Sequence, residues 1–115
     1  MQPAQSTSQQ PIENTTLEEV ALSYNSGTMG TFHAMQVCLP HLKVRGGTVI
    51  NFGSNTAVSG DPTFGAYAMA KEAIRGLTRV AAKEWGRYNI RVNCICPTAM
   101  SPAAEAWAER NPERF

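Results

Sequence analysis

The spacing of apolar residues predicts a helix over residues 28–42. Apolar side chains recur there three or four positions apart, which places them on one helical face. They are Met29, Phe32, Met35 or Gln36, and Leu39. Pro40 and Gly46 are expected to end this helix, because proline and glycine interrupt regular helices. A short acidic segment precedes it, and Thr15 or Thr16 can cap a helix there through its hydroxyl.

The strongest helical pattern covers residues 66–88. One face is apolar along its length, while lysine, arginine and glutamate lie elsewhere. The residues of that face are Ala70, Ile74, Leu77, Ala81 and Trp85. Gly76 interrupts the helix at a cost of up to about 1 kcal/mol, so we expect another helix to approach closely at this position.

Two short apolar segments predict buried strands. Residues 47–53 are β-branched and bounded by glycines, and residues 90–96 are stopped by Pro97. Residues 54–65 are rich in Ser, Asn, Gly, Asp and Pro, and we expect them to form a loop. Ser101 is suited to cap a further helix.

A strand, a helix and a strand in this order predict parallel pairing within an α/β fold. We expect a partial, doubly wound parallel sheet with two strands and long packing helices. Two parallel strands make an unusually small sheet, and their free edges can pair with another chain. The sequence is therefore interpreted as one incomplete domain over residues 11–115, which follows a disordered tail at residues 1–10.

Composition and charge argue against several classes of function. A net charge of +1 over 115 residues provides no electrostatic basis for binding nucleic acid or an anionic membrane. No apolar run reaches the roughly 18 residues that cross a bilayer. The first ten residues lack the basic and apolar parts of a signal peptide. These features predict a cytoplasmic protein.

The three cysteines agree with that location, since an odd number at wide spacing is a poor basis for disulfides. Cys94 and Cys96 are two positions apart and would share one face of a strand. A metal-binding pair is an open alternative. Because neither a second pair nor a histidine lies at ligand spacing, we expect buried thiols and no metal.

Tyr67 and Lys71 carry the chemistry that the sequence suggests. Residues four apart share a helix face, so the phenol and the ammonium can lie side by side. A nearby cation stabilises a phenolate, which suits a tyrosine to exchange a proton with an alcohol or ketone oxygen. Alone, this spacing also occurs on ordinary solvent-exposed helix faces. Ser54 strengthens the interpretation, because it follows a buried strand at the edge where open α/β sheets bind ligands.

Several segments together resemble the short-chain dehydrogenase/reductase family. The matching region extends from about Pro11 to Pro102 and so covers nearly the whole chain. It combines a serine at a strand end, a Tyr-x-x-x-Lys helix thirteen residues later and an Arg-Val-Asn-x-x-x-Pro segment beyond it. The segments are Gly30–Pro40, Thr48–Ser54, Tyr67–Thr78 and Ile90–Pro97. The resemblance implies a partial Rossmann-like fold.

The resemblance also implies a reaction and roles for single residues. Tyr67 would be the general acid/base, Lys71 would assist it and hold the nicotinamide ribose, and Ser54 would bind the substrate oxygen. The cofactor-binding residues would be Tyr67, Lys71, Pro97, Thr98 and Ser101. The reaction would transfer a hydride between NAD or NADP and a small alcohol or ketone substrate. The sequence specifies neither the substrate nor the choice of cofactor.

Three features depart from the family pattern. The glycine-rich turn that holds the cofactor pyrophosphate does not occur in this sequence. Gly27 occupies the position of the family's catalytic asparagine, and whether Asn25 substitutes for that asparagine stays open. Thr98 stands where the family usually has glycine.

Two hypotheses therefore stand beside each other. In the first, the chain is part of an NAD(P)-dependent oxidoreductase for alcohols or ketones. In the second, it is a truncated, non-catalytic relative that acts by association. The family's oligomer interfaces imply a homo-oligomer formed through the helices at 28–42 and 66–88. We expect no turnover by the 115-residue chain alone, because most of the adenosine half of the cofactor site is missing.

Overall fold

The computed structural model describes residues 9–98 and residue 110. In chain order the elements are the 3-10 helix η1 (Ile12–Asn14), α2 (Leu17–Ser23), the π-helix η2 (Tyr24–Thr28), α3 (Met29–Arg45), β1 (Gly47–Phe52), α4 (Asn55–Ser59), α5 (Gly65–Trp85), the 3-10 helix η3 (Gly86–Tyr88) and β2 (Ile90–Ile95). Most of the expected N-terminal tail and the helix expected after Ser101 lie outside the described residues. Gln10, near the end of that tail, forms a parallel bridge with Phe64.

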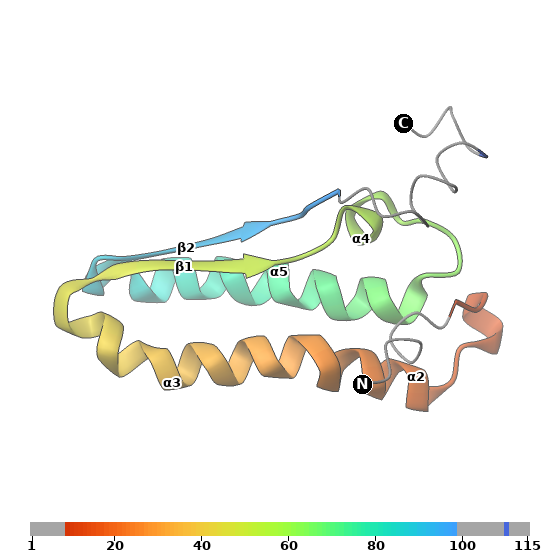
Figure 1. Cartoon of the computed structure of the whole chain (residues 1–115), viewed down its shortest axis with the longest axis horizontal. Coiled ribbons are helices and arrows are strands. Elements are labelled where there is room, and N and C mark those ends of the chain that lie inside the picture. The colour runs from red at the N-terminus through yellow and green to blue at the C-terminus, as the bar shows by residue number, and fades with distance from the viewer. Residues whose placement is uncertain (1–8, 99–109, 111–115) are drawn as a thin grey trace.

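The two strands pair in parallel, which confirms the predicted α/β class and the strand pairing. Gly47 lies opposite Ile90 at one end of the sheet, and Phe52 lies opposite Ile95 at the other. Because the strands are in register, both carboxyl ends reach the same edge. The loops that follow the two strands therefore begin side by side (Figure 1).

Both long helices lie on one side of the sheet, with α5 against β2 and α3 against β1 (Figure 1). The core between these layers consists of Met35 from α3, Ala81 from α5, and Ile90 and Val92 from β2. Burying these apolar side chains stabilises the fold by about 25 cal/mol per Å² removed from water. This core lies toward the amino ends of the strands, since Ile90 and Val92 are the first and third residues of β2.

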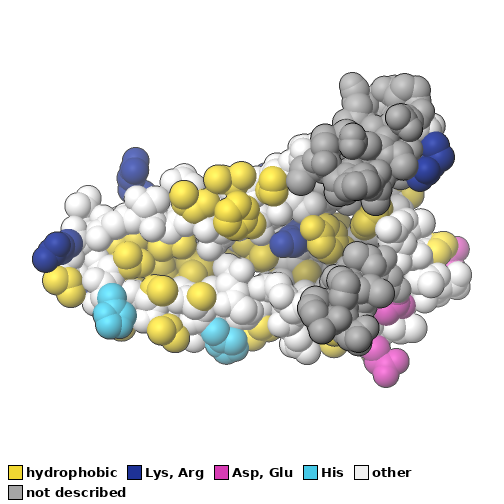
Figure 2. All heavy atoms as spheres, in the orientation of Figure 1, with side chains coloured by type: hydrophobic (Ala, Val, Ile, Leu, Met, Phe, Trp, Pro, Cys, Tyr) yellow, Lys and Arg dark blue, Asp and Glu magenta, His cyan; other side chains and the backbone are white. Residues whose placement is uncertain are grey.

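The other face of the sheet carries no helix among the described residues. Side chains alternate along a strand, and those that point away from the helices include Ile50, Phe52 and Ile95. Their exposed fractions are 50%, 56% and 46%. Figure 2 shows hydrophobic side chains gathered along this part of the molecule. The sheet thus presents an apolar face and two free edges.

The prediction that Pro40 ends the first long helix is wrong. α3 passes through Pro40 and ends at Gly46, whose φ of +83° suits glycine. A proline removes one backbone hydrogen bond, but Leu39 and Leu42 pack against the core on either side of it. Tertiary packing therefore carries the helix past the proline. The helix also follows α2 and η2 without an intervening loop, which the sequence pattern did not predict.

The second long helix is confirmed, with Ala70, Ile74 and Ala81 of its predicted face buried. The predicted loop at 54–65 contains the short helix α4, so that prediction is wrong for its first residues. The close approach expected at Gly76 is not found within the described residues, because a Cβ there would meet nothing within 4 Å. In the part of the chain that the structure describes, no helix has the length and apolar character to cross a membrane.

Candidate active site

The candidate site lies at the carboxyl ends of the two strands. The Gly53 amide donates a hydrogen bond to the carbonyl oxygen of Ile95 at 2.8 Å, which extends the sheet by one residue. The Asn55 amide donates to the carbonyl oxygen of Pro97 at 3.5 Å. These contacts hold together the two loops that follow the strands. Open α/β sheets bind their ligands at such an edge.

Ser54 joins β1 to α4 and is 7% exposed. It is the residue that precedes α4, yet its hydroxyl does not cap that helix. Its carbonyl oxygen accepts a hydrogen bond from the Val58 amide at 3.1 Å. α4 packs on α5, with Ala57 buried between them. The serine is therefore held by its backbone, and its hydroxyl is not used by the helix.

Tyr67 and Lys71 lie side by side in the first turns of α5. The Nζ atom of Lys71 lies 5.7 Å from the centre of the Tyr67 ring. Phe64 meets the Tyr67 ring edge to face, with ring centres 6.2 Å apart, and so restricts its orientation. Both residues are partly exposed and line one cavity of about 330 Å³. The structure thus brings Tyr67 and Lys71 together in one cavity.

The opposite wall of this cavity is formed by Ser23 at the end of α2 and by Ser26, Gly27 and Thr28 of the π-helix η2. Two hydrogen bonds fix η2 to α5. The buried Thr28 hydroxyl donates to the carbonyl oxygen of Ala70 at 2.6 Å, and the Tyr24 hydroxyl donates to that of Met69 at 3.4 Å. Both acceptors lie between Tyr67 and Lys71 in the sequence, so the wall is attached to the turn of α5 that carries these two residues.

The sequence pattern did not predict Ser26 as a site residue, and Gly27 was noted only as the residue at the position of the family's catalytic asparagine. Their position depends on the extra residue of a π turn, which leaves little trace in the spacing of apolar residues. The polar segment Tyr24–Thr28 within an otherwise helical run is the available signal. Asn25 is exposed and does not line the cavity, so the structure does not bring it to Tyr67.

The other expected site residues are less closely assembled. Ser54 does not line the cavity of Tyr67 and Lys71. Pro97 and Thr98 are exposed in the loop after β2, and Ser101 lies outside the described residues. The structure therefore places Ser54 and Pro97 at the carboxyl edge of the sheet, outside the lining of the cavity that Tyr67 and Lys71 share.

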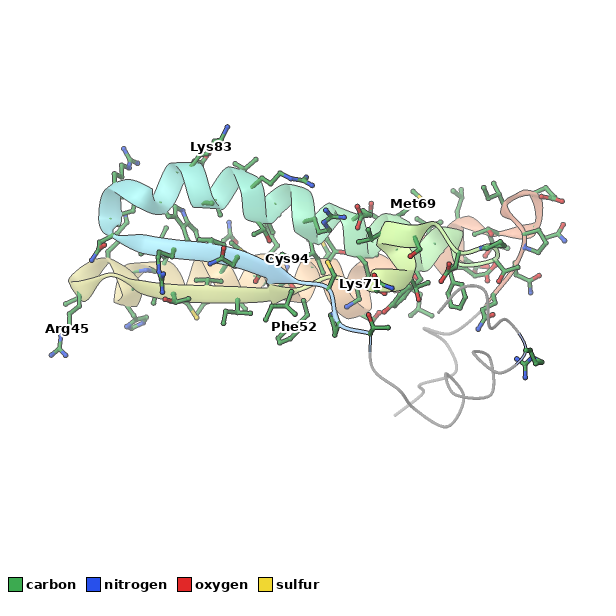
Figure 3. All side chains as sticks on the ribbon, turned by 90° about the horizontal axis from the view of Figure 1, so that it is seen from above. Arg45, Phe52, Met69, Lys71, Lys83 and Cys94 are labelled. Carbon is green, nitrogen blue, oxygen red and sulfur yellow. The ribbon has the colours of Figure 1, made fainter. Side chains whose placement is uncertain are left out.

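Lys71 also lines a second, larger cavity of about 620 Å³ between α3 and β1. Phe52, at the end of β1, lines the same cavity. Figure 3 shows Lys71 near the strand ends, where Phe52 and Cys94 are also labelled. The neighbouring carboxylate of Glu72 pairs with Arg75 at 2.9 Å. The ammonium of Lys71 is therefore a cation shared by two adjoining cavities.

No group of three or more His, Cys, Asp or Glu side chains within residues 9–98 is arranged to hold a metal ion. The arrangement instead offers a phenol beside an ammonium, with a serine at the adjoining strand end. Such groups can bind a polar oxygen and exchange a proton with it.

A family model described as enoyl-(acyl carrier protein) reductase matches residues 2–114. The chain belongs to the short-chain dehydrogenase/reductase family. It is 44% identical over 105 residues to the 12α-hydroxysteroid dehydrogenase of Clostridium sp.. That alignment covers 91% of this chain and 40% of the relative.

Solved structures agree with this assignment. The structure of ElxO with NADP bound is similar to this chain, with a TM-score of 0.77 and 25% sequence identity. The match covers 90% of this chain and 43% of ElxO. The chain superimposes on NAD⁺-bound xylitol dehydrogenase with a TM-score of 0.76 and 29% identity, covering 86% of this chain and 39% of that protein. The chain thus spans about 40% of the length of the relatives that it matches. The partial Rossmann-like fold is confirmed.

Proposed function

We propose that this chain supplies the proton-transfer part of an NAD(P)-dependent oxidoreductase that interconverts an alcohol and a ketone. The observation that carries the proposal is the Tyr67–Lys71 pair, with Nζ 5.7 Å from the ring centre, in a cavity near the carboxyl edge of a parallel sheet. Family membership supports the same reaction class.

In this proposal Tyr67 gives a proton to the substrate oxygen during reduction and takes it back during oxidation. Lys71 stabilises the phenolate that remains, because opposite charges attract more strongly in a partly enclosed site than in water. Ser54 donates a hydrogen bond to the same substrate oxygen. Since Ser54 does not line the cavity of Tyr67, the proposal requires the substrate oxygen to lie between the two hydroxyl groups, at hydrogen-bond distance from both.

The residues at this edge fit the nicotinamide half of the cofactor. Lys71 faces two adjoining cavities, so its ammonium can bind ribose hydroxyls in one while it supports Tyr67 in the other. Pro97 and Thr98, in the loop after β2, and Ser101 would contact the nicotinamide. When bound, the nicotinamide supplies or accepts the hydride. The groups present do not select between NAD and NADP.

The relative with 44% identity acts on a 12α-hydroxysteroid according to its name. A cyclic secondary alcohol is therefore the first substrate class to test. The proposal also places the protein in the cytoplasm, where thiols stay reduced; its three cysteines are free.

A segment exchange tests the proposal. The matching 105 residues of the Clostridium dehydrogenase are replaced by those of this chain, and oxidation of 12α-hydroxysteroid is followed at the nicotinamide absorbance band. We expect measurable turnover by the chimera and none by the 115-residue chain alone. A folded chimera that binds the cofactor but does not turn over would contradict the proposal.

A second function, association without catalysis, is supported by exposed apolar side chains on the outer faces of the two long helices. Val37 and Val44 on α3 are exposed, as are Met69 and Val80 on α5. The open space above Gly76 lies on the same helix as Met69 and Val80. We propose that these faces meet in a homo-oligomer, which sedimentation of the isolated chain would detect as a concentration-dependent increase in mass.

A further inference from the structure

Two thiols converge on one backbone position beside the strand ends. A Cβ built on Gly53 would lie 3.0 Å from the sulfur of Cys96 and 3.3 Å from that of Cys94. The two sulfurs are therefore separated by no more than the sum of these distances. Both cysteines are free and partly exposed, which corrects the expectation of fully buried thiols. Figure 3 shows Cys94 near Lys71 at the carboxyl end of the sheet.

Opposing influences act on the pKa of the Cys94 thiol. Burial raises the pKa of the Cys94 thiol, and the adjacent Cys96 raises it further. Hydrogen bonds from the Gly53 backbone and from Thr78 act in the opposite direction, because they stabilise the thiolate. The sulfur of Cys94 thus lies near polar groups of Gly53 and Thr78.

A cationic side chain completes the cluster. The Cγ atom of Arg75 lies 3.5 Å from the same Cβ position on Gly53. The pKa of Arg75 is raised mainly by its hydrogen bond to Glu72, and the nearby Cys96 and Cys94 raise it further. The guanidinium thus lies within electrostatic range of both sulfurs while it pairs with one carboxylate.

We propose that Cys94 and Cys96 form a two-thiolate site for a soft, two-coordinate cation, with Cu(I) as the best match. Thiolates select soft ions. A structural zinc site needs four ligands, and no third His, Cys, Asp or Glu joins the pair within the described residues. From the sequence we expect no metal, because neither a second cysteine pair nor a histidine lies at ligand spacing. That absence excludes a four-coordinate metal, but it does not exclude a two-coordinate one. The site uses residues that the proposed oxidoreductase reaction does not.

Binding is a substitution that leaves the copper oxidation state unchanged. Both S–H bonds break, two S–Cu bonds form, and the two protons pass to water. The bis-thiolate complex carries one negative charge, which Arg75 can offset. Because the sulfurs pack on Gly53, an occupied site would also stiffen the backbone that presents Ser54.

The test uses the 115-residue chain and Cu(I), kept reduced by ascorbate under nitrogen, in competition with the coloured chelator bicinchoninate. We expect one Cu(I) per chain. Cys94→Ser and Cys96→Ser should each weaken binding at least about a hundredfold, because a single thiolate remains. Cys38→Ser, which changes an exposed thiol on α3, should leave the affinity unchanged. Equal affinity in all three variants, or one Cu(I) per two chains, would overturn the proposal.

Two measurements do not depend on how the serine variants fold. In the unmodified chain, bound Cu(I) should protect Cys94 and Cys96 from iodoacetamide and leave Cys38 reactive, as read by peptide mass spectrometry. Arg75→Gln should weaken binding about three- to tenfold, and Arg79→Gln, on the exposed face of α5, should not. Protection of Cys38, or equal effects of the two arginine changes, would count against the site.

Discussion

Gly53 is the residue that connects the proposed active site to the thiol pair. It precedes Ser54, bonds to Ile95 through its amide, and has both sulfurs within 3.3 Å of the position that a Cβ would take. A glycine is needed there for space, since its backbone is not among those with positive φ. The strand end can therefore lie close to β2 only while this position lacks a side chain.

Gly53→Ala should destabilise the chain by about 1–3 kcal/mol, because the added methyl group must displace the sulfurs or the strand end. Urea unfolding followed by circular dichroism measures the change. Gly86→Ala is the matched control, since a Cβ there meets nothing within 4 Å and its φ is −57°. A loss of stability as large in the control as at Gly53 would contradict the packing argument.

Residue spacing alone predicted correctly that Tyr67 and Lys71 are neighbours. Tyr67 and Lys71 are four apart on one helix, so local geometry brings them together without information from the rest of the fold. Ser26 and Gly27 reach the same cavity through tertiary packing of η2 on α5. Their role could not be read from spacing, because it depends on contacts between segments about 40 residues apart.

At the level of elements, periodicity predicted the two strands and both long helices. It failed where the deciding interaction is tertiary. α3 continues through Pro40 because Leu39 and Leu42 are anchored in the core. α4 forms within a stretch of loop-like composition, where Ala57 packs against α5. Composition favours a loop at that position, and packing outweighs it.

Gly76 provides a prediction for α5. Gly76→Ala should raise the free energy of unfolding by about 0.5–1 kcal/mol, because alanine is the better helix former and the space is open within the described chain. Thermal unfolding at low protein concentration measures this. If the proposed oligomer packs on this face, the same change should weaken association in sedimentation. A destabilised monomer would contradict the open space at Gly76.

At the scale of the molecule, the sheet carries helices on one face only within residues 9–98 (Figure 1). The chain spans about 40% of its relatives, and within it Ile50, Phe52 and Ile95 form an exposed apolar face. The sequence predicted this incompleteness from the number of strands. It could not show which face would be bare, because that depends on the side of the sheet on which α3 and α5 both pack.

Phe52→Lys should reduce self-association of the isolated chain and change its stability by less than about 0.5 kcal/mol, because a side chain that is 56% exposed loses little packing. Light scattering and urea unfolding measure the two effects. Asn14→Lys, an exposed change in η1 and away from the sheet, is the control for added charge. Unchanged scattering in Phe52→Lys would show that this face does not drive association.

The central claim is that Tyr67 transfers the proton. The most direct measurement compares kcat of the segment-exchange chimera with kcat of its Tyr67→Phe and Tyr88→Phe variants; Tyr88 lies in η3 beyond the far end of α5. Loss of a positioned acid/base should lower kcat about 10²–10⁴-fold in the Tyr67→Phe variant, while cofactor binding is retained. The kcat of the Tyr88→Phe variant should stay close to that of the unmodified chimera. A Tyr67→Phe chimera that keeps its turnover would contradict the account.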